Sequence, residues 1–126
     1  MGDSRDERLA AQDRGQLAEA RAAVVLESEG WTILARNWRG GGGEIDLVAE
    51  RAGCLRFVEV KLRDPEDPLR EEAIPDSKRR RLRGAALAWE MEHGQPAIEV
   101  CFLVAWVEAH DDAWRVEWLD DPFDDA

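Results

Sequence analysis

The sequence GEIDLVAERAGCLRFVEVKL occupies residues 43–62 and contains two strand-like segments joined by a short turn. Residues 45–49 and 55–62 are rich in aliphatic and β-branched side chains, and a glycine-containing link separates them. We therefore predict a β-hairpin. If it turns tightly on Ala52-Gly53, residue 51 pairs with 54 and 50 with 55, so that Asp46 lies directly opposite Glu59.

This register predicts a cluster of acidic and basic side chains on one face of the hairpin. Side chains two apart on a strand share a face, so Glu59 and Lys61 point the same way. Directly opposed residues have Cβ atoms about 5 Å apart, and two carboxylates at that distance repel unless a cation lies between them. Lys61 is one such cation. Mg²⁺, which takes one or two carboxylates and keeps several waters, is another. A longer loop would shift the pairing by one or two residues and place Glu44 differently.

Working outward, hydrophobic periodicity and turn residues predict one α/β domain over residues 1–126. Its element order is α-β-β-β-α-β-β, a mixed central sheet flanked by helices. The glycine run at 40–43 is predicted to be a mobile entry beside the site, and residues 1–7 and 120–126 to be flexible tails. The expected helices cover 8–29 and 77–92, the expected strands 31–38, 45–49, 55–62, 98–107 and 114–119, and a proline-containing loop 64–76.

Glu19 is a further candidate for the site, although it lies far from the hairpin in sequence. Its neighbours three, four and seven positions later on the first helix are Ala22, Ala23 and Leu26, so it projects from an apolar surface. A glutamate on a core-facing stripe needs an explanation, whereas an exposed one does not. The alternative is a surface glutamate at the edge of a wide helix face.

The net charge of −11 argues against nucleic-acid binding, but its distribution weakens that objection. Residues 36–83 carry twelve Lys or Arg against ten Asp or Glu, whereas residues 84–126 carry one against eleven. Basic residues of the middle segment are candidates for phosphate contacts, or else ordinary solvated surface. These candidates are Arg36, Arg39, Arg63, Lys78, Arg79 and Arg81.

Composition also predicts where the protein works. No apolar run approaches the roughly 20 residues of a membrane span, and the polar start is not typical of a signal peptide. Cys54 and Cys101 lack metal-ligand spacing and are expected to be reduced thiols. We expect a cytoplasmic protein that does not associate with membranes.

The order of Asp46, a spacer and Glu59-Val60-Lys61 resembles the PD-(D/E)XK nuclease signature. More closely, the chain resembles the YraN-like family of small bacterial proteins, which are similar to archaeal Holliday junction resolvases. One departure is that the family usually has Arg-Phe-Asp where this chain has Cys101-Phe102-Leu103. The resemblance covers roughly residues 15–90, with a weaker echo at 118–123, and rests on Gly15, Ala18-Glu19, Asn37, Arg39, residues 43–49, residues 57–61, Arg63, Lys78 and Arg81-Leu82.

The resemblance implies a restriction-endonuclease-like fold and a site for Mg²⁺ or Mn²⁺. Asp46 and Glu59 would be metal ligands, Lys61 the catalytic lysine, and Glu19 the helix carboxylate that resolvase-like members add to the site. The implied reaction is endonucleolytic hydrolysis of DNA, branched or single-stranded, leaving a 5′-phosphate and a 3′-hydroxyl. Because a DNA junction has two-fold symmetry, a homodimer is expected by analogy.

Two other interpretations remain open. The same fold can serve as a non-catalytic module that binds nucleic acid or a protein, and the acidic charge favours this reading. The second of these interpretations is a nuclease whose partner protein supplies the basic surface.

Overall fold

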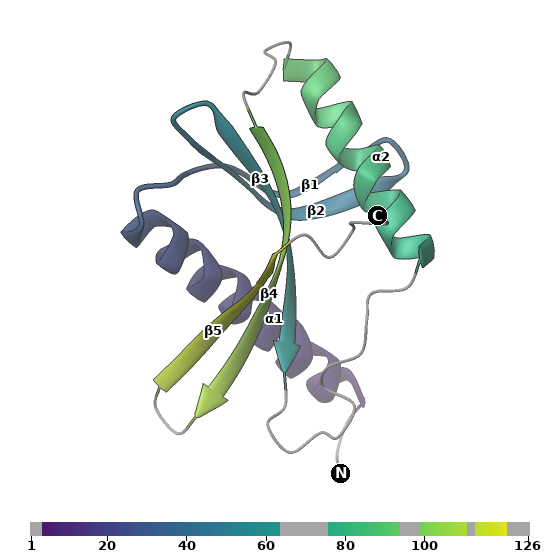
Figure 1. Ribbon diagram of the computed structural model, residues 1–126. Helices are drawn as coiled ribbons and strands as arrows, with labels where there is room; N and C mark the ends of the chain where they lie inside the picture. The colour runs from purple at the N-terminus through teal and green to yellow at the C-terminus, as the bar shows by residue number, and fades with distance from the viewer. Residues whose placement is uncertain (1–3, 64–75, 94–98, 111–112, 121–126) are drawn as a thin grey trace.

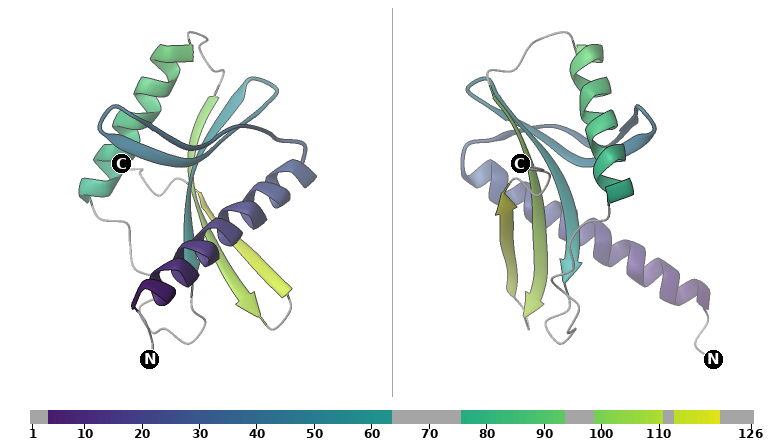
Figure 2. Two further views of the ribbon diagram at one scale, coloured as in Figure 1. Left: turned by 180° about the vertical axis from the view of Figure 1, so that it is seen from behind. Right: turned by 45° about the vertical axis from the view of Figure 1, so that its right-hand side comes forward.

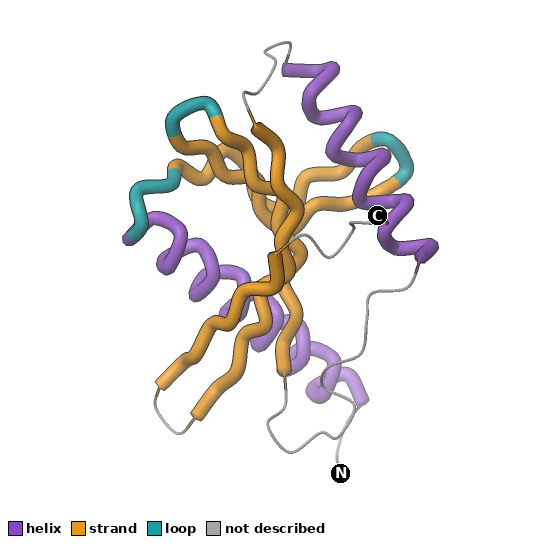
Figure 3. Tube along the Cα trace, viewed as in Figure 1, coloured by secondary structure: helices purple, strands orange, loops and turns teal. Residues whose placement is uncertain are grey.

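A computed structural model describes residues 4–63, 76–93, 99–110 and 113–120, and it confirms the predicted α/β class and element order (Figures 1 and 3). The five-stranded sheet has the order β1-β2-β3-β4-β5. Strands β3 and β4 are parallel, and the other neighbours are antiparallel. The elements are α1 (Ser4–Ser28), β1 (Thr32–Gly40), β2 (Gly43–Arg51), β3 (Cys54–Arg63), α2 (Asp76–His93), β4 (Glu99–His110) and β5 (Ala113–Asp120).

Helix α1 begins at Ser4, so most of the segment predicted to be an N-terminal tail is helical. Strand β5 likewise extends to Asp120. The predicted tails at 1–3 and 121–126, and the predicted loop at 64–75, lie outside the described residues.

Each face of the sheet is covered by one helix, and each layer encloses its own core (Figure 2). On the α1 side, Ala22 and Leu26 pack with Val58 of β3. On the α2 side, Leu82 and Trp89 pack with Phe57, the neighbouring residue of β3. Strand β3 is therefore apolar on both faces, and each fully buried side chain of this size contributes about 1.5–3 kcal/mol. Within the described ranges, neither helix combines the length and the apolar composition that a membrane crossing requires.

Helix α1 ends where Gly30 was predicted to stop it. Gly30 has φ +90°, the left-handed conformation that glycine adopts without steric conflict. Its N–H donates to the carbonyl of Glu27, and the N–H of Trp31 donates to the carbonyl of Leu26 at 3.0 Å. This pair of bonds is the Schellman arrangement, which satisfies the last carbonyls of a helix. It turns the chain directly into β1.

The glycine run, predicted to be a mobile entry beside the site, is a tight turn between β1 and β2. Gly40 pairs with Gly43, and Gly41 and Gly42 have φ +57° and +80°, as in a type I′ hairpin turn. A Cβ added at Gly41 would collide with the backbone carbonyl of Gly84 in α2. Glycine thus allows the hairpin tip to pack directly on the helix backbone, beside the first turns of α2.

Strand β2 changes face at Asp46. Leu47 packs in the α1-side core and Ile45 in the α2-side core, although side chains two apart on a regular strand share a face. On β1, Asn37 lies between the pairs Arg36↔Leu47 and Trp38↔Ile45, and it has φ +51°. The hairpin therefore bends at Asn37 and Asp46, and its tip turns toward α2 (Figure 1).

Candidate functional site

The site lies where β2 separates from β3. The predicted hairpin register is confirmed from Arg51↔Cys54 to Leu47↔Val58, with Ala52 and Gly53 forming the turn at positive φ. Asp46 and Glu59 come immediately after the last paired residues. Instead of continuing the ladder, Asp46 accepts a hydrogen bond at its Oδ2 from the backbone N–H of Val60, at 2.7 Å. The register brings the two carboxylates together, and the bend opens the sheet beside them.

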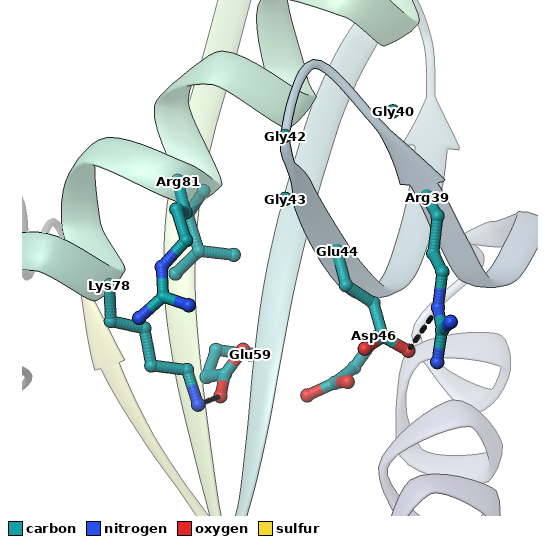
Figure 4. A pocket seen from close by; sticks show the side chains of 10 residues that line it. Arg39, Gly40, Gly42, Gly43, Glu44, Asp46, Glu59, Lys78 and Arg81 are labelled. Atoms are coloured by element: carbon teal, nitrogen blue, oxygen red, sulfur yellow. Dashed lines mark ion pairs between the residues drawn. The ribbon is translucent and has the colours of Figure 1, made fainter.

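A pocket of about 650 Å³ lies at this opening (Figure 4). We call it the carboxylate pocket. Three parts of the chain build it: the β1–β2 hairpin tip, the middle of β3 and the first turns of α2. Its lining residues are Arg39, Gly40, Gly42, Gly43, Glu44, Asp46, Glu59, Lys78, Arg81 and Leu82.

Asp46 lies in surroundings that disfavour its charged form. Burial raises its pKa from the ordinary 3.8 to about 7, and the nearby negative charge of Glu59 adds to this effect. Glu19 and Glu44 raise the pKa of Asp46 further, whereas the hydrogen bond from Val60 lowers it. An aspartate with a pKa near 7 in a pocket is typical of functional sites.

Lys78 of α2 supplies a cation to this acidic cluster. Its Nζ lies 2.5 Å from Oε1 of Glu59, whose residue is only 5% exposed. Burial alone would lower the pKa of Lys78, but its hydrogen bond to Glu59 and the charge of that carboxylate outweigh burial and raise it. The sequence placed Lys78 among phosphate-contacting residues. The structure shows that its first partner is Glu59, a long-range contact that sequence pattern does not reveal.

Lys61 is half-buried two residues beyond Glu59 on β3. Burial lowers its pKa, and the neighbouring ammonium group of Lys78 lowers it further, whereas Glu59 and Asp46 act in the opposite direction. Lys61 is therefore close to the other predicted site residues, although it does not line the pocket itself. Continued by two residues, the predicted pairing of Asp46 with Glu59 would put Glu44 opposite Lys61, but Glu44 pairs with Arg39 at 3.9 Å (Figure 4).

Glu19 approaches the same cluster from α1. Burial raises its pKa, the charges of Glu44 and Glu59 raise it further, and Arg36 opposes them. The side-chain amide of Asn37 donates a hydrogen bond to Oε2 of Glu19 at 3.1 Å, which also lowers that pKa. No role in the site was predicted for Asn37 from the sequence. The available signal was an asparagine within an otherwise strand-like segment, since Asn tolerates left-handed backbone better than most residues.

The predicted phosphate-contacting residues do not all lie at the carboxylate pocket. Arg39 and Arg81 line the carboxylate pocket with Lys78, and Arg36 lies near Glu19. Arg79 does not line the pocket. Arg63 ends β3, and its side chain lies outside the described residues.

The residues present fit a divalent cation of the Mg²⁺ class. No three carboxylate, histidine or cysteine side chains in the described ranges are close enough together to hold an ion as a ready-made set. Mg²⁺ nevertheless needs only one or two carboxylates when waters complete its shell. Asp46 and Glu59 supply such an oxygen pair, and the ammonium group of Lys78 shows that a cation already compensates Glu59. Glu19 is the adjacent third carboxylate.

Comparison with known proteins places the chain in a family. The model of the uncharacterised protein family UPF0102 matches residues 18–107, a range that includes all four predicted catalytic residues. A UPF0102 protein of Synechococcus sp. (strain JA-3-3Ab) is 44% identical over 104 residues, covering 80% of this chain and 79% of the relative. One from Methylocella silvestris is 37% identical over 117 residues, covering 89% and 94%. One from Bradyrhizobium sp. (strain ORS 278) is 45% identical over 87 residues, covering 69% and 61%. The resemblance to the YraN-like family is thereby confirmed, and the chain belongs to the uncharacterised protein family UPF0102.

Proposed function

We propose that this protein is a divalent-metal-dependent endonuclease of the PD-(D/E)XK superfamily, similar to the Holliday junction resolvases, that hydrolyses DNA phosphodiesters to a 5′-phosphate and a 3′-hydroxyl. One observation carries the proposal. Asp46 and Glu59 meet at the open end of a hairpin, in a pocket where Lys78 already compensates Glu59. Repelling carboxylates are retained at such a place when function requires a cation there.

Asp46 and Glu59 would hold Mg²⁺ or Mn²⁺, with Glu19 as a third ligand reached directly or through water. When bound, the ion would polarise a phosphoryl oxygen of the substrate and neutralise its developing charge. Oxygen donors of this kind suit both metals.

The chain's own cations would position the phosphate and handle the proton. Arg39, Lys78 and Arg81 line the pocket and present N–H donors where a phosphate would enter. Lys61 lies two residues beyond Glu59 on β3 and has a lowered pKa, which increases the share of neutral amine. In that form Lys61 would hold the attacking water and accept its proton. These local cations offset the overall acidity of the chain near the site.

Cleavage of defined substrates tests the proposal. Purified protein is incubated with branched, single-stranded and duplex DNA in the presence of Mn²⁺. The wild type should cleave at least one substrate, and Asp46→Asn and Lys61→Met should abolish cleavage. Glu27→Gln, which removes an exposed carboxylate of α1 remote from the pocket residues in sequence, is the matched control and should leave cleavage unchanged. Equal cleavage by all proteins would point to a contaminating nuclease.

The second candidate is a non-catalytic binding module on the same fold. The lack of a ready-made three-ligand set in the described ranges favours it, as does the net charge of −11. In that case the wild type and both site variants would be inert with every DNA and would bind it alike. Calorimetric titration with Mn²⁺ tests the metal site separately. If Glu59→Ala binds Mn²⁺ with the same affinity as the wild type, Glu59 is not a metal ligand.

A further inference from the structure

Asn37 has a backbone conformation that its place in a strand does not require. Its φ of +51° lies in the left-handed region, a backbone conformation that residues with a Cβ seldom adopt. It lies at the bend of the β1–β2 hairpin, between Arg36 and Trp38, which keep regular pairing with β2. Such outliers persist where the surroundings impose them, and they gather at functional sites.

The bend alone does not explain an asparagine at this position. Glycine adopts positive φ without steric conflict, and the chain uses it at Gly30, Gly41, Gly42 and Gly53. At Asn37 the chain instead has a residue whose side chain carries hydrogen-bonding groups, whereas Ala52, at φ +52°, has none. The side chain of Asn37 is therefore available for a task besides the bend.

That task is visible in its contact. The Nδ2 of Asn37 donates to Oε2 of Glu19 at 3.1 Å, so the bend of the hairpin is joined to α1. One oxygen of Glu19 is thereby held, which limits the orientations that its carboxylate can take. The flanking pairs Arg36↔Leu47 and Trp38↔Ile45 place Asn37 at the same level of the hairpin as Asp46. The charge of Glu19 also acts on Asp46, so the held carboxylate lies near the predicted metal ligands.

We propose that Asn37 is a positioning residue, which uses its left-handed backbone to aim its amide at Glu19 and so orients that carboxylate toward the metal site. This inference rests on the proposed function, because it assigns Glu19 to the same cation as Asp46 and Glu59. Outer partners that orient a ligand commonly affect metal affinity almost as strongly as the ligands themselves.

Calorimetric titration with Mn²⁺ tests the inference through a double-mutant cycle. Asn37→Gly removes the amide and keeps the backbone conformation, so the fold should persist with an unchanged or higher unfolding midpoint. Its Mn²⁺ affinity should fall about 10-fold, the lower end of the losses seen when an orienting partner is removed. In a Glu19→Ala background, Asn37→Gly should have no further effect, since nothing is left to orient.

Ala52→Gly is the matched control. Ala52 is the other described non-glycine residue with positive φ, at +52°, and it lies in the β2–β3 turn without a polar side chain. This variant should relieve the same backbone strain and leave Mn²⁺ affinity unchanged. Unfolding in urea without metal adds an independent measurement, in which Asn37→Gly and Glu19→Ala should be coupled by a factor of roughly 3–10 in the unfolding equilibrium constant.

The outcomes separate the two proposals. If the wild type does not bind Mn²⁺, the proposed function fails and this role for Asn37 fails with it. If the wild type binds but Asn37→Gly binds equally well, or loses as much affinity in the Glu19→Ala background, only the role of Asn37 is overturned. If the two substitutions are additive in urea, the contact with Glu19 has no energetic weight and the role is also rejected.

Discussion

Replacing Asp46 by Asn should make the protein more stable at neutral pH while it removes the proposed metal site. The pKa of Asp46 is about 7 in the folded protein against an ordinary value of 3.8. Between these values the unfolded chain carries the charge and the folded chain does not. The free energy of unfolding of the wild type therefore falls as pH rises from about 4 and levels off above about 7.

The magnitude follows from the same difference. A shift of roughly 3 pK units corresponds to ~4 kcal/mol at 25 °C once the folded Asp46 is fully ionised. Asn keeps a carbonyl oxygen that can accept the N–H of Val60, so the substitution removes the charge and retains an acceptor for that bond. The free energy of unfolding of the variant should exceed that of the wild type by about 1–2 kcal/mol at pH 5 and by about 4 kcal/mol at pH 8, because only the wild type loses stability between these pH values.

Urea unfolding from pH 5 to pH 8, with EDTA to exclude metal, measures this difference. Glu27→Gln is the control, since it removes an exposed carboxylate, and its difference from the wild type should stay small and constant with pH. An advantage of Asp46→Asn that does not grow with pH would refute the reasoning. It would mean that Asp46 ionises at an ordinary pH and that the pocket does not oppose its charge.

Three further predictions concern the same pocket. Lys78→Met should lower the free energy of unfolding by about 1–3 kcal/mol, because Glu59 is left buried without this partner. In thermal unfolding, Mn²⁺ should then raise the unfolding midpoint of the variant by more than that of the wild type. In urea unfolding, Gly42→Ala should lower the free energy of unfolding by roughly 1 kcal/mol, and Gly41→Ala should lower it by more. The reason is that, of these two positions, a Cβ at Gly41 would meet the backbone of α2 and a Cβ at Gly42 would not. Equal losses would contradict this packing. The affinity for Mn²⁺ measured by calorimetry should rise up to tenfold per pH unit below pH 7 and level off above it, because a proton on Asp46 competes with the metal; a flat profile would exclude Asp46 as a ligand.

The sequence predicted those features of the molecule that depend on local pattern. The turn at Ala52-Gly53 fixes the pairing of β2 with β3 as far as Leu47↔Val58, and Asp46 and Glu59 are the next residues of the two strands. The stop at Gly30 and the element order follow from residue preferences of the same local kind. Glu19, which the sequence singled out by its apolar surroundings on α1, lies within reach of the charges of Glu44 and Glu59.

The features that could not be predicted from the sequence depend on contacts between segments that are far apart in the chain. Parity assumes a regular strand, and it fails at Asp46, where the hairpin bends and Ile45 crosses to the other core. The glycine run suggested mobility because its packing partner, the backbone of α2, leaves no trace in the local sequence. Lys78 reaches Glu59 only after α2 has packed on the sheet, so its basic neighbours in sequence indicated a phosphate contact instead.

The bond from the Val60 N–H to Asp46 makes one backbone amide a reporter on the pocket. Most strand amides bond to the backbone of a neighbouring strand, whereas this one bonds to a carboxylate that is expected to change its state. A proton or a cation that engages Oδ2 of Asp46 would move the ¹H–¹⁵N resonance of Val60 and speed its exchange with solvent. Val58, paired with Leu47 inside the ladder, provides an internal reference. Metals, nucleotides and DNA fragments can thus be screened on the intact protein through a single peak, before any substrate has been identified.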